Sequence, residues 1–195
     1  MKGLNLCCGK NKLPDCDNVD FNADFSPDLC FDIRKRFPLE NAVYDEVYLF
    51  HSIEHVEGKF HRPIFAEAHR VLKPGGIFYL SYPEFKHIAQ FWIDNYKGMR
   101  DFWKDTIYGR QETLLDFHVY PMDSSEVMEQ LREIGFVGIE HKTETPDVFN
   151  SIIRCTAGTP WIGYEEVLQN ELNKTTVHLG ISVGDGIELG EKVSL

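Results

Sequence analysis

The sequence lacks long apolar runs and is poor in positive charge. No stretch approaches 18 consecutive apolar residues, so the sequence predicts no transmembrane helix. Residues 1–9 hold no apolar run of the length of a secretory signal peptide, and we expect none there. The sequence has 31 acidic residues and 20 lysines and arginines, which gives a formal net charge of −11. A negative field of this size repels phosphate backbones, so a nucleic acid is not favoured as a partner.

Cysteine is scarce, and its number is odd. Cys7 and Cys8, two of the five cysteines, are adjacent inside an apolar stretch. This pattern predicts reduced, buried thiols in a cytoplasmic protein and does not fit a disulfide framework. The short basic run Arg34-Lys35-Arg36 is too small for a nucleic-acid groove, and we expect it to be a solvated loop.

Apolar β-rich runs alternate with helical patterns over roughly the first 155 residues, which predicts an α/β fold with a mostly parallel sheet. The expected strands are residues 4–8, a short run ending at 20, 28–32, 43–50, 77–82, 136–143 and 149–156. One expected helix covers residues 60–72 and is closed by a turn at 73–76. Another is capped by Asp123 or Ser124 and ends at Gly135.

Residues 83–120 interrupt this alternation and are rich in aromatic side chains. Two interpretations stay open for them: a helical subdomain with its own small core, and a lid over the carboxyl ends of the strands. We therefore expect one domain over residues 1–156 that carries this insertion. Residues 157–195 form a C-terminal extension of unassigned role.

The most informative feature is the order strand, glycine turn, strand, acid. Gly9 follows the first strand, Asp20 ends the second and Asp32 ends the third. Ligands of open α/β sheets bind outside the carboxyl ends of the strands, and a glycine there lets the backbone approach them closely. Asp20 suits the two hydroxyls of a ribose, and Asp32 with the backbone N–H of Ile33 suits an adenine. Taken singly, these residues also fit a plain turn and solvated loop acids.

The segments LNLCCG, NVD, YDEVYLFHSIEHV and RVLKPGG, in this order, resemble the class I methyltransferases of the type-11 group. The sequence is especially similar to a bacterial and phage subgroup of predicted S-adenosylmethionine-dependent methyltransferases. In that subgroup NVD closely follows the glycine loop, a segment like IYGRQETLLDFH follows the fifth strand, and a later helix ends in GF. The resemblance spans about residues 3–145. It implies a Rossmann-like methyltransferase fold, with a twisted sheet and helices on both faces.

The resemblance also implies S-adenosylmethionine as cofactor, S-adenosylhomocysteine as product, and a site at the strand ends. Asp20 would hold the ribose, and Asp32 with Ile33 the adenine. The other implied cofactor-binding residues follow the first and fourth strands: Cys7, Cys8, Gly9, Phe50, His51 and Ser52. The last three would line the methionine and sulfonium end.

The first loop departs from the family pattern. Lys10-Asn11-Lys12 follows Gly9 where many class I methyltransferases carry further glycines, and the gap to Asp20 is too short for a full helix. The backbone of this loop, with Lys10 or Asn11, is therefore expected to hold the methionine end.

The catalytic candidates lie in the insertion. Methyl transfer from a sulfonium depends mainly on alignment and on exclusion of water, and it needs a general base only when the acceptor is protonated. His118 is the candidate base, because it matches a histidine of the subgroup; a structural hydrogen bond is its alternative role. Met122 stands where the subgroup has a tyrosine, and Tyr120 is the candidate to replace it.

Other function classes fit less well. A nicotinamide-dependent dehydrogenase requires G-x-G-x-x-G, which the sequence lacks. His51, Glu54 and His55 fit the H-x-x-E-H pattern of zinc peptidases, but that pattern must lie on a helix and here it follows a strand-like run. We therefore predict no metal. A protein that keeps the fold without activity stays open. The acidic balance and the aromatic insertion favour a small molecule, a saccharide or a protein side chain over a polynucleotide as acceptor, with a small molecule or saccharide as the leading expectation.

Overall fold

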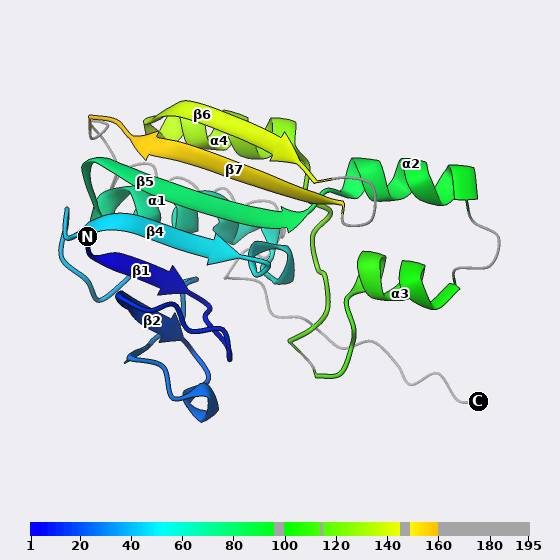
Figure 1. Cartoon of the computed structure of the whole chain (residues 1–195), viewed down its shortest axis with the longest axis horizontal. Helices are drawn as coiled ribbons and strands as arrows, with labels where there is room; N and C mark the ends of the chain where they lie inside the picture. Colours follow the sequence, from blue (N-terminus) through cyan, green and yellow to red (C-terminus); the bar gives the residue numbers. More distant parts are fainter. Residues whose placement is uncertain (96–99, 114, 145–148, 160–195) are drawn as a thin grey trace, which may run out of the picture.

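The computed structural model describes residues 1–95, 100–113, 115–144 and 149–159. A seven-stranded sheet with the strand order β3-β2-β1-β4-β5-β7-β6 runs through them (Figure 1). Its strands are β1 (Gly3–Leu6), β2 (Cys16–Asp20), β3 (Leu29–Cys30), β4 (Tyr44–Phe50), β5 (Leu72–Pro83), β6 (Phe136–Thr143) and β7 (Asn150–Ala157).

The strand directions bring the predicted site residues to one edge of the sheet. β1 pairs in parallel with β2 and β4, β2 with β3, and β4 with β5. β7 runs antiparallel to its neighbours β5 and β6. Because neighbouring parallel strands end at the same edge, the residues that follow β1, β2, β3 and β4 meet there. The predicted α/β fold with a mostly parallel sheet is confirmed.

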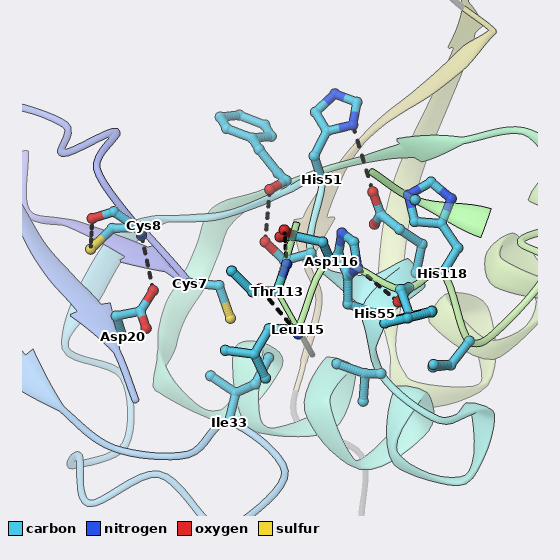
Figure 2. Close-up of a pocket in the computed structure, with 18 of the residues that line it drawn as sticks. Cys7, Cys8, Asp20, Ile33, His51, His55, Thr113, Leu115, Asp116 and His118 are labelled. Carbon is cyan, nitrogen blue, oxygen red and sulfur yellow. Dashed lines mark hydrogen bonds and ion pairs between the residues drawn. The ribbon is translucent and has the colours of Figure 1, made fainter. Parts of the chain in front are cut away.

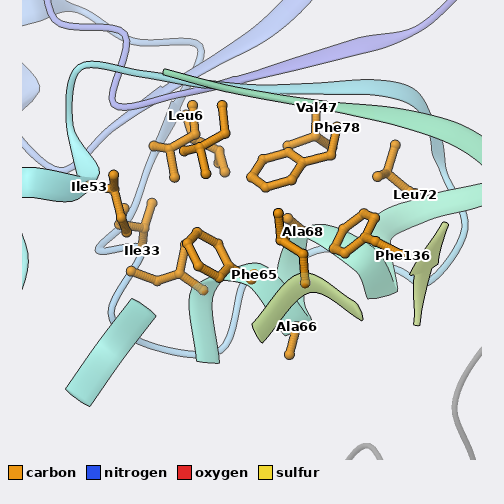
Figure 3. Close-up of a cluster of buried hydrophobic side chains, with 14 of the residues drawn as sticks. Leu6, Ile33, Val47, Ile53, Phe65, Ala66, Ala68, Leu72, Phe78 and Phe136 are labelled. Carbon is orange, nitrogen blue, oxygen red and sulfur yellow. The ribbon is translucent and has the colours of Figure 1, made fainter. Parts of the chain in front are cut away.

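Helices α1 (His61–Val71) and α4 (Ser124–Ile134) pack on one face of the sheet and against each other (Figure 1). Phe65 of α1 lies over Phe78 of β5, with ring centroids 6.1 Å apart, and Phe78 stacks on Phe136 of β6 at 5.5 Å (Figure 3). Burying an aromatic or branched side chain in this core contributes about 1.5–3 kcal/mol each. This core holds the strand ends in fixed positions.

Both predicted caps of α4 are present. The side chain of Asp123 accepts hydrogen bonds from the backbone N–H groups of Ser125 (2.8 Å) and Glu126 (3.3 Å). Gly135 ends the helix in the left-handed conformation at φ 112°, and its N–H donates to the carbonyl of Arg132. Glycine adopts this conformation without the steric cost that a Cβ adds.

The structure corrects three predicted boundaries. Residues 73–76 are part of β5, because β5 already pairs with β4 at Leu72 and the register shifts before Ile77. The first strand ends at Leu6, where the backbone bends. The third strand is reduced to Leu29–Cys30. Three short 3-10 helices complete the connections: η1 (Ala23–Phe25), η2 (Ile53–His55) and η3 (Gly58–Phe60).

The insertion is helical, as predicted, and lies beyond the carboxyl ends of the parallel strands (Figure 1). It contains α2 (Phe85–Asn95) and α3 (Arg100–Tyr108). Ile88 and Phe149 form a small separate core there, and Phe91 packs on Phe149 with ring centroids 4.9 Å apart. No helix in the described part of the chain is long and apolar enough to cross a membrane.

The second face of the sheet carries half-buried polar and aromatic side chains. Tyr48 and Tyr79 stack there with ring centroids 5.0 Å apart, and Arg154 lies on the neighbouring strand β7. In the described residues, both helices that pack on the sheet cover the opposite face. Helices on this second face therefore stay a prediction.

Candidate active site

Two sharp backbone bends lie side by side at the edge where β1 and β4 end. Cys7 and Gly9 follow β1 with φ angles of 54° and 50°, and His51 follows β4 with a φ of 47°. Cys7 and His51 carry a Cβ, so each left-handed conformation is unfavourable and persists because its surroundings hold it. The N–H of His51 donates to the carbonyl of Ser81 at 2.9 Å, which ties the second bend to β5.

Asp20 holds the first bend. Its Oδ2 accepts from the backbone N–H of Gly9 at 2.9 Å, and its Oδ1 accepts from the N–H of Asn22 at 2.9 Å. The residue is 5% exposed. Each carboxylate oxygen can accept more than one hydrogen bond, so these contacts leave acceptor capacity for the two hydroxyls of a ribose.

Two buried asparagines hold the loop between β1 and β2, and sequence reasoning missed them. The amide of Asn5 donates to Oδ1 of Asn18 (2.9 Å) and to the carbonyl of Asn11 (3.1 Å). Asn18 Oδ1 also accepts from the N–H of Leu13 (2.8 Å), and Asn18 Nδ2 donates to Asp28 (2.8 Å). The loop contains no helix, as the short spacing predicted. The available signal was the pair of polar residues inside otherwise apolar strands.

Asp32 is paired with Arg34, for which we predicted no role in the site. Arg34 donates to both carboxylate oxygens of Asp32, from Nε at 3.0 Å and from Nη2 at 2.9 Å. These bonds hold the pKa of Asp32 below its ordinary value. The basic run that contains Arg34 is exposed, as predicted. Ile33, by contrast, is buried.

The residues after β4 face the same space. Phe50 is partly exposed, and its carbonyl accepts from the hydroxyl of Ser52 at 2.8 Å. Nδ1 of His51 lies 3.7 Å from Oε1 of Glu54. The H-x-x-E-H pattern thus covers a strand end and the 3-10 helix η2. The α-helix that a zinc peptidase of this pattern requires is not formed at these residues, so that alternative fails.

A cavity of about 1210 Å³ lies beside both bends (Figure 2). It is lined by every residue predicted to bind the cofactor: Cys7, Cys8, Gly9, Asp20, Asp32, Ile33, Phe50, His51 and Ser52. Asn11 also lines it, whereas Lys10 does not. His118 and other residues of the insertion form the opposite wall, including Thr113 and Asp116. The volume exceeds that of ordinary small-ligand pockets, which leaves room for two molecules.

The thiol of Cys7, which lines this cavity, is expected to be unreactive. Burial, with a smaller contribution from Asp20, raises the pKa of Cys7 to about 12. A thiol with this pKa stays protonated at neutral pH, and the thiolate is the nucleophilic form. Cys7 therefore contributes surface to the cavity and no nucleophile.

His118 is held by two main-chain contacts. Its Nδ1 lies 3.1 Å from the carbonyl of Thr106, and its N–H donates to the carbonyl of Tyr108 at 3.1 Å. Burial lowers the pKa of His118, against an opposing effect of the Glu54 carboxylate. The imidazole is therefore neutral at neutral pH. With Nδ1 donating to Thr106, Nε2 carries the free lone pair.

Tyr120 points elsewhere. Its hydroxyl donates to the carboxylate of Glu126 on α4 (3.0 Å to Oε1), and its ring lies edge-on to His61 at 4.8 Å. It lines a smaller cavity of about 310 Å³ together with Met122 and His118. Tyr120 does not line the main cavity, so its catalytic role stays a prediction.

The loop that carries His118 is closed at its base. Gly109 has a φ of 79°, and its N–H donates to the carbonyl of Asp105 at 2.9 Å. A Cβ at Gly109 would lie 1.7 Å from the carbonyl oxygen of Asp116, so no other residue fits without movement of the backbone. This glycine brings the two ends of the loop together.

Comparison with known proteins agrees with this geometry. The family model for the type-11 methyltransferase domain matches residues 10–80. This match supports a methyltransferase domain with S-adenosylmethionine as cofactor. No curated protein sequence matches the chain.

Solved structures share the fold of this methyltransferase domain at low sequence identity. A methyltransferase from Methanosarcina mazei is 14% identical with a TM-score of 0.57, over 80% of this chain and 92% of that one. One from Archaeoglobus fulgidus is 12% identical with a TM-score of 0.57, over 80% and 85%. The carbon methyltransferase CurJ is 17% identical with a TM-score of 0.54, over 82% of this chain. The chain spans 49% of the length of CurJ.

The residues present fit an adenosine cofactor. A Cβ built on Gly9 would meet no protein atom within 4 Å, so the space beside this bend is open to the cavity. Asp20 supplies carboxylate acceptors, while Ile33 and Phe50 supply apolar surface on either side. Hydroxyl acceptors next to apolar surface are what a nucleoside requires.

Proposed function

We propose that this chain transfers a methyl group from S-adenosylmethionine to a small molecule or a saccharide bound in the same cavity. The observation that carries the proposal is the single cavity lined by all predicted cofactor residues on one wall and by the insertion on the other. Its volume of about 1210 Å³ accommodates a cofactor and an acceptor together.

The cofactor residues take distinct roles in this proposal. Asp20 accepts from the ribose hydroxyls and at the same time fixes the bend at Gly9. Ile33 packs on the adenine, and Asp32 orients toward its amino group while paired with Arg34. The loop from Cys7 to Gly9 and the bend from Phe50 to Ser52 border the methionine and sulfonium end. The bound sulfonium supplies an already activated methyl group.

The insertion, residues 83–120, is the acceptor wall of a domain over residues 1–156. Its loop from Gly109 to His118 faces the cofactor residues across the cavity. This wall aligns the acceptor atom with the methyl group and keeps water out, the two effects that matter most for a displacement at an activated carbon. The predicted extension, 157–195, lies outside the described residues beyond residue 159.

The charge of the wall supports the proposed class of acceptor. Asp105 and Asp116 stand beside one arginine, Arg110, and Glu57 lies on the neighbouring loop. Carboxylates repel a phosphate backbone but accept hydrogen bonds from hydroxyl groups, and Phe117 offers an apolar surface for a sugar ring. A neutral, hydroxyl-rich acceptor suits these side chains better than a polynucleotide does.

His118 is the residue through which a proton would leave the acceptor. Nε2 is the atom available for this, since Nδ1 is engaged by Thr106. Exchange of His118 for alanine is expected to leave S-adenosylhomocysteine binding unchanged and to lower turnover. Unchanged turnover on the true acceptor would remove His118 from the reaction.

The experiment that tests the proposal is calorimetry of the full chain with S-adenosylhomocysteine, followed by transfer of labelled methyl from S-adenosylmethionine to fractionated metabolite and saccharide pools. Binding with transfer to one fraction is expected. Binding without transfer to any fraction would favour the alternative of a protein that keeps the fold without activity. Absence of binding at micromolar concentration would contradict the cofactor site itself.

A further inference from the structure

Glu54 and His55 meet His118 at the wall of the cavity, although more than 60 residues of the chain separate His118 from the other two. Figure 2 shows the two histidines side by side. One donor atom from each of these side chains lies within 4.8 Å of the donors of the other two. The imidazole rings of His55 and His118 stand edge to face with centroids 4.9 Å apart. Two imidazoles and a carboxylate form a common set of metal ligands in proteins.

The carboxylate of Glu54 is buried, and one of its two oxygens lacks a hydrogen-bond partner in the described residues. The residue is 2% exposed, and its Oε2 has no hydrogen-bond partner in the described part of the chain. Its Oε1 faces Nδ1 of His51 at 3.7 Å, beyond hydrogen-bond distance. A buried carboxylate oxygen without a partner is costly, and the usual solutions are a paired charge or a metal ion. Glu54 is also one of the residues that line the cavity.

Both histidines are oriented as metal ligands usually are. Nδ1 of His55 lies 2.9 Å from the carbonyl of Phe117, and Nδ1 of His118 lies 3.1 Å from the carbonyl of Thr106. A ligating imidazole typically donates one ring N–H to a carbonyl or carboxylate, which fixes the tautomer and leaves the other nitrogen for the metal. The same arrangement leaves Nε2 of both histidines free.

The backbone holds the two segments together. The N–H groups of Val119 and Tyr120 donate to the carbonyl of Glu54, at 2.9 and 3.3 Å. His118 is therefore tied beside η2 by the next residues in the chain. Metal–ligand bonds of about 2.1 Å put two ligands of one ion about 3 to 4 Å apart. The three donor atoms, all within 4.8 Å of one another, are close to this spacing.

We propose that Glu54, His55 and His118 bind one divalent transition-metal ion of the kind that takes mixed nitrogen and oxygen ligands, with Zn²⁺, Co²⁺ and Mn²⁺ as probes. The ion would hold an oxygen of the methyl acceptor, a role that rests on the proposed function. It replaces the sequence-based prediction of no metal. Because Nε2 of His118 would ligate the ion, it also replaces the role of His118 as the base that takes the proton. A metal-bound hydroxyl loses its proton more readily, which makes a protein base unnecessary.

The test uses the full chain, stripped with a chelator and returned to chelator-free buffer. Calorimetry with Zn²⁺ and the visible spectrum with Co²⁺ are measured for the wild type and for Glu54→Gln, His118→Gln and the matched control His87→Gln, an exposed histidine of α2. We expect one equivalent of metal in the wild type and the control, and at least tenfold weaker binding in the two site variants. Circular dichroism checks that each variant is folded.

Several outcomes would overturn the site. These are a wild type that does not bind Zn²⁺ at tens of micromolar, a Co²⁺ spectrum equal to that of the aqueous ion, or a His118→Gln variant that binds like the wild type. If a variant does not fold, the wild-type Co²⁺ spectrum decides, because nitrogen ligands change its bands.

Binding of S-adenosylhomocysteine in the presence of chelator is measured separately. Metal binding without cofactor binding would refute the proposed function and leave the site standing, while the reverse result would refute the site alone.

Discussion

The backbone N–H of Gly9 donates to the carboxylate of Asp20 at 2.9 Å, so the acid that ends β2 fixes the bend that ends β1. The same carboxylate lines the cavity. One side chain thus shapes the turn and offers acceptors to a ligand, which explains why a single glycine is enough in a loop where many class I methyltransferases have several.

Exchange of Asp20 for alanine is expected to weaken S-adenosylhomocysteine binding by about 1–3 kcal/mol, through loss of charge-assisted hydrogen bonds. Calorimetry of the variant measures this. The matched control is Asp24→Ala, an exposed acid of η1 that does not line the cavity, and it should bind like the wild type. Wild-type affinity in the Asp20 variant would refute the ribose assignment.

Exchange of Asn18 for alanine should release the loop between β1 and β2. Its buried amide bonds to Leu13 and Asp28, and its removal takes away the hydrogen bond that the amide of Asn5 donates to it. We expect the free energy of unfolding to fall by about 1–3 kcal/mol, and S-adenosylhomocysteine affinity to fall as well. Urea denaturation and calorimetry measure the two effects. Gln90→Ala, an exposed amide on α2, is the control, and an equal loss in both variants would contradict the role of Asn18.

The cysteines should differ strongly in reactivity. Burial raises the pKa of Cys7 and of Cys155 to about 12, whereas Cys30 is exposed. At pH 8 only about one in ten thousand molecules of such a buried thiol is a thiolate. Timed alkylation of the native protein with mass spectrometry should label Cys30 first. Labelling of Cys7 at the rate of Cys30 would show that the β1 bend is open.

The stability of the fold should decrease in mild acid. Burial lowers the pKa of His61 and of His69 in the fold, while in the unfolded chain both take up protons near pH 6.5. The contribution of these two neutral histidines to the stability of the fold is therefore complete above about pH 6.5, and it is lost as the pH falls below this value. Urea denaturation at a series of pH values measures the free energy of unfolding. This free energy should depend less steeply on pH in His61→Gln than in the wild type, and His87→Gln should behave like the wild type. A steeper dependence in His61→Gln would contradict this.

The sequence predicts those parts of the fold that local chemistry determines. Asp123 and Gly135 bound α4 because a cap side chain and a left-handed glycine act within one turn of the chain. The turn predicted at residues 73–76 was wrong, since β5 already begins at Leu72 through pairing with Tyr44 of β4, and this pairing depends on a distant strand. In the same way the order of glycine and acids predicted one common cavity, because parallel strands bring their ends together.

Contacts between distant segments account for what the sequence missed. Nothing near Glu54 in the chain indicates that His118 lies beside it, because the insertion makes that contact. Tyr120 was matched by its distance from His118 along the chain, but the backbone turns its hydroxyl to Glu126. The pairing of Asp32 with Arg34 is local. It was still missed, because a basic run beside an acid has the same sequence pattern whether its side chains are paired or solvated.

In the loop from Gly109 to His118, the residues that hold the loop in place differ from some of those that line the cavity. The glycine joins the ends of the loop, and His118 is bonded to Tyr108 and Thr106 just before it. Arg110 lies between these anchor points and lines the cavity, whereas the hydroxyl of Thr113 accepts from the N–H of Leu115 and helps to shape the loop. Substitution of Arg110 would exchange one acceptor for another during evolution while the anchored histidine kept its position.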